Sequence, residues 1–113
     1  MGERKITVVI SECPSPLVAE RLRMGVGLTL EDGNKVRILF TDGGIYAVSG
    51  IDRERGRFDL DRHLEMFNLM ELPVYFHAPS AAARGIAIDR KGFAPVDDDG
   101  AAALLRESDV VLG

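Results

Sequence analysis

Few side chains of this 113-residue chain could do chemistry, and they stand directly after short β-branched or aromatic runs. The only cysteine, Cys13, follows the run at 6–10. Asp42 follows a second run, and His77 closes a third one, three residues before Ser80. A cysteine thiolate can act as a nucleophile or carry sulfur, whereas a histidine can exchange protons near neutral pH. These side chains are the first candidates for a functional site.

Cys13 and His77 each have a functional and a structural interpretation. Cys13 precedes a predicted helix, whose dipole would favour a reactive thiolate; the alternative is an inert small residue packed in a loop. His77 could bind a ligand or exchange protons with a nearby Cys13. Alternatively, its ring bonds a backbone carbonyl or faces solvent. The sequence leaves both pairs of alternatives open.

Asp42 is followed by Gly43 and Gly44, which would let a ligand approach the backbone because glycine has no side chain. A sharp turn from strand to helix explains the same three residues without a ligand. For Ser80 we expect a cap on the short helix that follows rather than a nucleophile. No Asp-His-Ser order with a recognisable spacing supports nucleophilic catalysis.

The sequence gives little support to a metal or cofactor site. It contains no glycine-rich phosphate loop of a known kind. His63 has no second histidine one helical turn away, and the acidic run at 97–99 lacks the glycine and distal glutamate of a calcium loop. We expect no metal and no cofactor.

The runs before the candidates are too continuously apolar for half-exposed strands and fit strands buried in a parallel sheet. Ser15 as N-cap and Pro16 in the first turn predict a helix after the first run. The alternation of strands and helices predicts an α/β fold of three layers, α/β/α, with a mainly parallel sheet of about five strands. Strands are expected at 5–11, 35–41, 74–77 and 110–112, with an edge strand at 86–88 and an extended lead-in at 93–96. Helices are expected at 16–31, 45–48, 59–72, 80–84 and 100–107.

Parallel strands place the loops after their carboxyl ends at one edge of the sheet. We therefore expect Cys13, Asp42 and His77 to lie along this edge, the carboxyl rim. Their common location is the reason to consider them together as one site.

The helix predicted at 16–31 has more apolar surface than one sheet-facing stripe requires. Its main stripe consists of Val18, Leu22, Val26 and Leu30. A neighbouring apolar arc consists of Leu17, Met24 and Leu28. Exposed apolar surface of this kind commonly marks a contact with another chain, so we expect an oligomer.

Composition excludes several classes of function. The net charge of −4 and the scattered lysines and arginines give no reason to expect nucleic acid as a partner. No apolar stretch approaches the roughly 18 residues that cross a bilayer, so we expect no membrane insertion. A single cysteine cannot form an intrachain disulfide, and no signal peptide is visible, so a cytoplasmic location is expected.

Three segments together resemble the DsrE/DsrF/TusC-like family of sulfur-relay proteins. They are 6–11, the run from 36 into Asp42-Gly43-Gly44-Ile45-Tyr46, and 73–85, which reads Pro-Val-Tyr-Phe-His-Ala-Pro-Ser-Ala-Ala-Ala-Arg-Gly. The resemblance implies the same three-layer α/β/α fold for the whole chain, as a single DsrE/DsrF-like domain over residues 1–113.

In that family the third strand typically ends in a cysteine that carries sulfur as a persulfide, eight residues before the glycine of an Arg-Gly pair. Counting back from Gly85 leads to His77, and the position of a second cysteine found in some members is Ser80. The resemblance therefore implies an accessory or binding subunit of sulfur relay rather than the principal persulfide carrier. It also implies a homo-trimer or homo-hexamer, or a hetero-oligomer with related relay subunits.

A second hypothesis comes from another class of function. The protein would bind a small molecule, or act as an enzyme, through the rim of Cys13, Asp42 and His77 itself. A reactive Cys13 would favour this alternative, and an inert, buried one would favour the accessory subunit.

Overall fold

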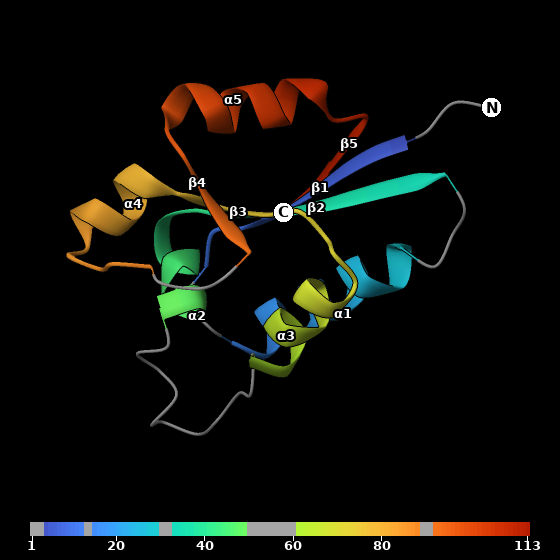
Figure 1. Ribbon diagram of the computed structural model, residues 1–113, viewed down its shortest axis with the longest axis horizontal. Helices are drawn as coiled ribbons and strands as arrows, with labels where there is room; N and C mark the ends of the chain where they lie inside the picture. Colours follow the sequence, from blue (N-terminus) through green and yellow to red (C-terminus); the bar gives the residue numbers. More distant parts are fainter. Residues whose placement is uncertain (1–3, 13–14, 30–32, 50–60, 89–91) are drawn as a thin grey trace.

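The part of the chain that the structure describes contains five strands, which form one parallel sheet (Figure 1). The computed structural model describes residues 4–12, 15–29, 33–49, 61–88 and 92–113. The strands are β1 (Arg4–Ile10), β2 (Asn34–Phe40), β3 (Val74–His77), β4 (Phe93–Val96) and β5 (Val110–Leu112). They lie side by side in the order β4-β3-β2-β1-β5. The predicted sheet of about five strands is confirmed.

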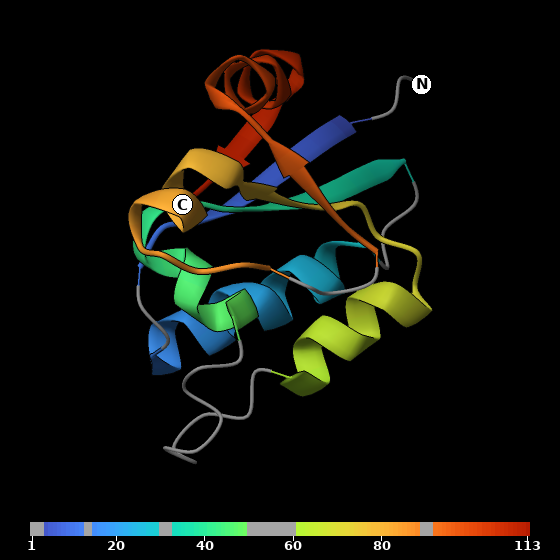
Figure 2. The ribbon, with the colours of Figure 1, turned by 60° about the vertical axis from the view of Figure 1, so that its left-hand side comes forward.

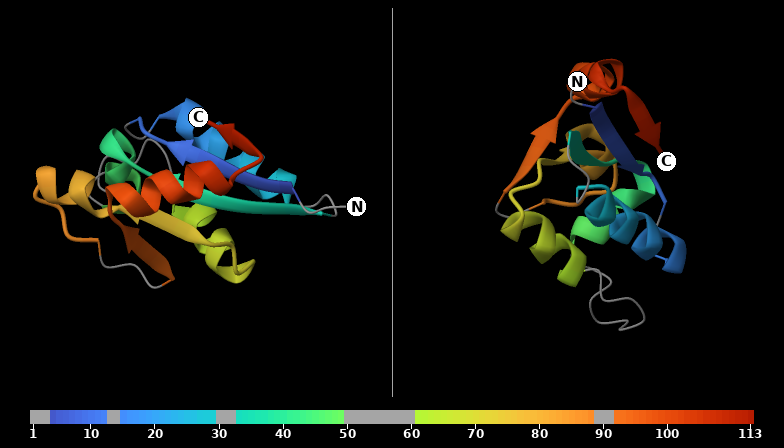
Figure 3. Two further views of the ribbon diagram at one scale, coloured as in Figure 1. Left: turned by 90° about the horizontal axis from the view of Figure 1, so that it is seen from above. Right: turned by 90° about the vertical axis from the view of Figure 1, so that its right-hand side faces the viewer.

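Helices cover both faces of the sheet. Those within the described residues are α1 (Pro16–Leu28), α2 (Ile45–Ser49), α3 (Asp61–Leu69), α4 (Ala78–Ala83) and α5 (Asp98–Glu107), together with the 3-10 turn η1 (Asp42–Gly44). Helices α1 and α3 pack against each other below the sheet, whereas α5 crosses the opposite face (Figure 2). Figure 3 shows the sheet between these two layers, which confirms the predicted α/β/α arrangement.

The core lies mainly between the sheet and α1. The side chains of Val8, Ile38 and Phe40 are fully buried, and they meet Leu22 of α1 and Phe67 of α3 in one apolar cluster. Alternate residues of β1 and β2 therefore face α1, as a buried parallel strand requires.

The start of α1 is as the sequence predicts. Pro16 opens the helix, and the Ser15 hydroxyl accepts a hydrogen bond from the Val18 N–H at 3.2 Å. The end comes earlier than the predicted 31, because side chains satisfy the last carbonyls of the helix. The Thr29 hydroxyl donates to the Val26 carbonyl at 2.6 Å, and the Asn34 amide donates to the Leu28 carbonyl at 3.0 Å.

The prediction for the segment after Gly85 is wrong in one respect. Residues 86–88 do not form a strand; Ile86 and Ile88 pack, partly buried, against the core. The edge strand is instead β4, whose Phe93 ring stacks on Phe40 with the centroids 6.5 Å apart. Pro95 is tolerated there because an edge strand has one side without ladder hydrogen bonds.

The apolar arc predicted on α1 is largely exposed. Leu17 and Met24 face solvent, whereas Leu28 packs partly buried against the core. Met66 and Leu69 of the adjacent α3 are exposed too, Leu69 to 80%. The described part of the chain has no helix that is both long and apolar enough to cross a membrane.

Candidate functional site

The turn after β2 is fixed against the end of β1. The Thr41 N–H donates to the Ile10 carbonyl at 3.0 Å, and the Gly44 N–H donates to the Thr41 carbonyl at 2.8 Å. A Cβ at Gly44 would lie only 2.0 Å from the Ile10 carbonyl oxygen. Only glycine fits at this position, so close packing is a sufficient reason for the glycine here, whether or not a ligand binds.

His77, at the end of β3, has a partner on each ring nitrogen. Its Nδ1 lies 2.5 Å from Ser80 Oγ, and its Nε2 lies 2.5 Å from Asp98 Oδ1. The His77 side chain is 17% exposed, whereas that of Asp98, in the first turn of α5, is 84% exposed. The imidazole therefore links a buried hydroxyl to a surface carboxylate.

Ser80 extends this chain to the second loop of the carboxyl rim. The residue is 5% exposed, and its Oγ accepts a hydrogen bond from the Asp42 backbone N–H at 3.0 Å. With that acceptor role filled, one tautomer satisfies every group: the hydroxyl donates to His77 Nδ1, and Nε2–H donates to Asp98. Asp42 is held at a positive φ of 47° in this turn, a conformation that aspartate tolerates better than most residues.

The expected capping role of Ser80 is wrong. Helix α4 begins at Ala78, its N-cap is His77 without a side-chain cap bond, and Ser80 lies within the helix. The helix begins two residues earlier than predicted because Pro79 suits the first turn, where N–H groups lack partners within the helix. The Ser80 hydroxyl therefore does not cap the helix and instead accepts a hydrogen bond from the Asp42 N–H.

No local pattern marks Asp98 as a partner of His77. It stands 21 positions after His77 and is one of three acidic residues near a helix start. Asp97 takes the cap, since its side chain accepts from the Gly100 N–H at 2.7 Å. The pairing of β3 with β4 then brings the next residue, Asp98, to the His77 ring.

Asp98, His77 and Ser80 make an Asp-His-Ser chain, but its geometry does not suit acyl transfer. The Ser80 hydroxyl is buried and already holds two partners. The Asp42 N–H donates to Ser80 Oγ itself and not to a site where an oxyanion could form. The arrangement orients the His77 ring and can pass a proton along it.

Arg84 adds a positive charge beside these residues. Its Nη1 donates to the Ser80 carbonyl at 3.2 Å, and its guanidinium carbon lies 5.9 Å from the centre of the Tyr46 ring. Gly85 follows with a positive φ of 65°, which ends α4 as predicted. Helices α2 and α4, which carry Tyr46 and the start of this segment, lie together at the end of the sheet where the strands finish (Figure 1).

The structure brings Asp42, Gly43, His77 and Ser80 together at the carboxyl rim, with Gly44 packed on β1. Cys13 and the side chain of His63 lie outside the described residues, so the expected approach of Cys13 to His77 stays a prediction. Among the residues described, no three His, Cys, Asp or Glu side chains are grouped so that they could hold a metal ion.

Known proteins share the fold of this chain. No family model matches it, and no curated protein matches its sequence. The ychN protein from E. coli superposes with a TM-score of 0.76 over 96% of this chain and 97% of its own, at 22% identity. MTH1491, a protein of unknown function from Methanobacterium thermoautotrophicum, gives 0.73 over 98% and 100%, at 9% identity. The likeness shows that this chain shares the α/β fold of these two proteins.

Proposed function

We propose that the protein is an accessory or binding subunit of an intracellular sulfur relay. The observation that carries the proposal is His77 at the end of β3, held by Ser80 and Asp98, on the fold shared with the ychN protein. The resemblance assigns a persulfide cysteine to this position. An imidazole does not form a stable persulfide, so the chain serves the sulfur chemistry of another subunit.

The role of the His77 ring follows from its partners. Asp98 accepts from Nε2–H and fixes the orientation of the ring, while the Arg84 guanidinium adds a cation nearby. A persulfide anion brought to the rim by another subunit would meet these groups and two backbone turns. The protein would thus bind and orient the anion without bonding to its sulfur.

Assembly is part of the proposal. The exposed apolar side chains Leu17, Met24, Met66 and Leu69 lie on the adjacent helices α1 and α3, and they offer a surface for a second chain. We propose a trimer or hexamer, of this chain alone or with related relay subunits, in the cytoplasm.

Light scattering tests the assembly. We expect the mass of three or six chains for the protein alone, and a lower mass after Leu17→Ser combined with Met24→Ser. The matched control is Leu105→Ser, which removes an exposed leucine from α5 on the opposite face. The mass of a single chain for the wild type, with no gain on adding a related relay subunit, would contradict the proposal.

The alternative function is a small-molecule-binding protein or enzyme that uses Cys13, Asp42 and His77 directly. The hydrogen-bonded chain from Asp98 through His77 to Ser80 favours it, because such a chain can move a proton. It predicts a reactive Cys13 thiolate beside the ring, whereas the accessory role predicts an inert one.

Sulfur transfer to the chain separates the two functions. In a Cys13→Ser background, His77→Cys places a thiol where the resemblance expects one. A persulfide donor would pass its outer sulfur to the new thiolate and leave as a thiolate itself. Mass spectrometry should show a gain of one sulfur at residue 77, faster than at Leu69→Cys, an exposed thiol remote from the rim. Wild-type protein that takes sulfur at Cys13 as fast would favour the alternative.

A further inference from the structure

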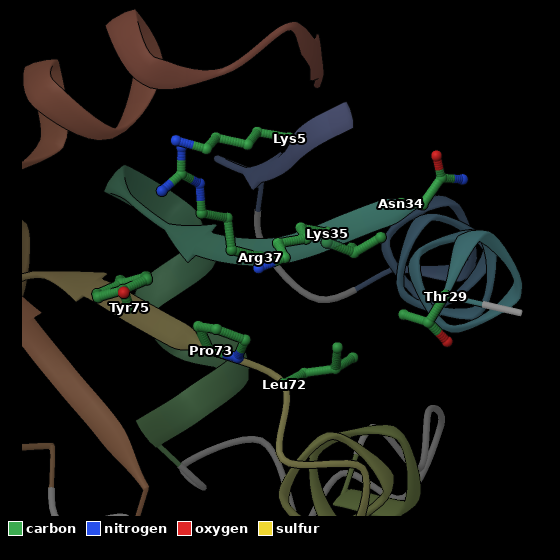
Figure 4. Close-up of a pocket in the computed structure, with 9 residues that line it drawn as sticks. Lys5, Thr29, Asn34, Lys35, Arg37, Leu72, Pro73 and Tyr75 are labelled. Carbon is green, nitrogen blue, oxygen red and sulfur yellow. The ribbon is translucent and has the colours of Figure 1, made fainter. Parts of the chain in front are cut away.

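A cavity of about 300 Å³ opens at the end of the sheet opposite the carboxyl rim, between the first half of β2 and the chain that leads from α3 into β3 (Figure 4). Its volume lies at the lower end of the range of roughly 300–1,000 Å³ for small-molecule sites. The lining of this β2 notch includes Val36 and Arg37 of β2, Leu72 and Pro73 of the incoming chain, and Tyr75 of β3.

The backbone of β2 faces its two neighbouring strands in alternation. In a parallel sheet both backbone groups of one residue point to one neighbour, and those of the next residue point to the other. The Ile38 N–H donates to the Pro73 carbonyl at 3.1 Å, whereas the Gly33 carbonyl accepts from the Arg4 N–H of β1 at 2.7 Å. The even-numbered residues of β2 therefore face β3. The N–H and C=O of Val36 point to this side and into the notch, two residues before the pairing with β3 begins.

On this side Val36 has no bonding partner among the described residues. The register of Ile38 with Val74 would place residue 73 opposite the Val36 carbonyl, but Pro73 has no N–H. It would place the carbonyl of Glu71 opposite the Val36 N–H, but Glu71 stands outside β3 at a positive φ of 56° and makes no such bond. Val36 is only 3% exposed, and backbone groups at buried positions are nearly always paired. The open donor and acceptor of Val36 therefore mark a place for a ligand.

Three polar side chains of the notch are already engaged. The Arg37 guanidinium pairs with Glu107, its Nη1 lying 3.4 Å from a carboxylate oxygen. The Asn34 amide donates to the Leu28 carbonyl at 3.0 Å, and Lys35 also has an interaction partner. The buried polar groups that the notch offers are the uncharged backbone groups described above, which favours a neutral ligand over an ion.

Apolar surface lies on both faces of the notch. By the register of β2 with β3, the side chain of Tyr75 leaves the same face of the sheet as that of Arg37, the face covered by α5. Leu72 packs partly buried against the core, which lies on the α1 face. Figure 4 shows Leu72, Pro73 and Tyr75 around the opening. A flat group that bonds to the open backbone in the plane of the sheet would contact carbon on both of its faces.

The donor and the acceptor belong to one residue and point the same way. The cis-amide or amidine edge of a planar ring presents an acceptor beside a donor, so it can form both hydrogen bonds at once. A peptide added as a strand would instead need such pairs from alternate residues. The next residue of this kind after Val36 is Ile38, and its N–H is already bonded to Pro73. The small volume of the notch agrees with a single ring system.

We propose that the β2 notch binds a neutral planar ring with a cis-amide or amidine edge, the class to which lactams and free nucleobases belong. The Val36 N–H donates to the acceptor of the ring, and the Val36 carbonyl accepts from its N–H. The faces of the ring pack between Leu72 and Tyr75. This site is separate from the carboxyl rim and does not depend on the function proposed for it.

Amide chemical-shift titrations of the intact protein test the proposal with 2-pyridone, adenine and 4-pyridone. The first has a lactam edge and the second an amidine edge, whereas 4-pyridone is an isomer of 2-pyridone with its donor and acceptor at opposite ends of the ring. We expect 2-pyridone and adenine, at millimolar concentration, to shift the Val36 amide proton downfield, because it gains an acceptor. 4-Pyridone should bind roughly threefold to tenfold more weakly, since it can form only one of the two bonds. An unshifted Val36 amide with both edge probes, or equal affinity for the two pyridones, would overturn the proposal.

Pro73→Ala tests the same site from the side of the protein. It restores the N–H that the register places opposite the Val36 carbonyl, so the chain itself competes with the ligand for this acceptor. The affinity for 2-pyridone should fall roughly threefold to tenfold. The matched control is Pro95→Ala in β4, outside the lining, which should leave the affinity unchanged.

A second pair of variants tests the apolar wall. Tyr75→Ala removes the ring on the α5 face and should weaken the binding of 2-pyridone several-fold, whereas Tyr75→Phe keeps the ring and should bind like the wild type. Wild-type affinity in both Pro73→Ala and Tyr75→Ala would overturn the proposal.

Discussion

The two ends of the sheet differ in how their residues are held: by side-chain hydrogen bonds at the carboxyl rim, and by strand pairing at the start of β2. At the carboxyl rim, the Asp42 amide, the Ser80 hydroxyl, both His77 nitrogens and the Asp98 carboxylate bond to one another. At the opposite edge of the sheet, β2 begins at Asn34, four residues before its pairing with β3 starts at Ile38 opposite Val74. The polar groups of the rim hold one another in place and have few hydrogen bonds left for a ligand. The first half of β2 pairs with β1 alone among the described strands.

The largest effect is expected where the rim is packed most tightly. Gly44→Ala would place a methyl group 2.0 Å from the Ile10 carbonyl oxygen. This oxygen belongs to the backbone of β1 and cannot move without distorting the strand. We expect a loss of about 3 kcal/mol or more in the free energy of unfolding, measured by urea denaturation. Gly27→Ala is the control: nothing lies within 4 Å of its Cβ, and helix propensity predicts a gain of about 0.5–1 kcal/mol. A harmless Gly44→Ala would mean that the turn is not fixed on β1.

Ser80→Ala should have the next largest effect. It leaves the Asp42 N–H and His77 Nδ1 without their partner at a partly buried place, which costs about 1–2 kcal/mol in the free energy of unfolding. Ala82→Ser, at an exposed position of the same helix, should change stability far less. Equal effects of the two substitutions would show that the rim is not a connected hydrogen-bonded unit.

Asp98→Asn should cost less, because the carboxylate is exposed. We expect about 0.5 kcal/mol from the weakened pair, comparable to other surface contacts. The clearer readout is the nitrogen chemical shift of His77, which should show a lower fraction of the Nε2–H tautomer. An unchanged tautomer ratio would mean that Asp98 does not orient the ring.

Sequence reasoning succeeded where a local pattern determines the structure. The continuous apolar runs around Val8, Ile38 and Phe76 predicted buried parallel strands, and Ser15 with Pro16 predicted the start of α1. It failed where two distant segments decide. The strand at Phe93 depends on its stacking with Phe40, which a short run containing a proline does not reveal.

The candidate sites follow the same division. Asp42 and His77 could be placed on one rim because parallel strands dictate it. The contact of His77 with Asp98 depends on which strand lies beside β3, and the cavity beside the first half of β2 depends on where its pairing with β3 begins. The residues of one strand alone determine neither which strand lies beside it nor the register of their pairing.

The pairing of the first strand with the last one has a consequence for synthesis on the ribosome. Lys5 and Asp109 stand 104 positions apart and are joined by two hydrogen bonds: the Lys5 N–H donates to the Asp109 carboxylate, and the Asp109 N–H donates to the Lys5 carbonyl. At about 5–20 residues per second, β1 waits roughly 5–20 seconds for its second neighbour. The face of the sheet that later packs against α5 carries Thr7 and Arg37, which water can solvate during that interval. The nascent sheet therefore exposes a surface less prone to aggregate than the buried Val8 and Ile38 on its other face would be.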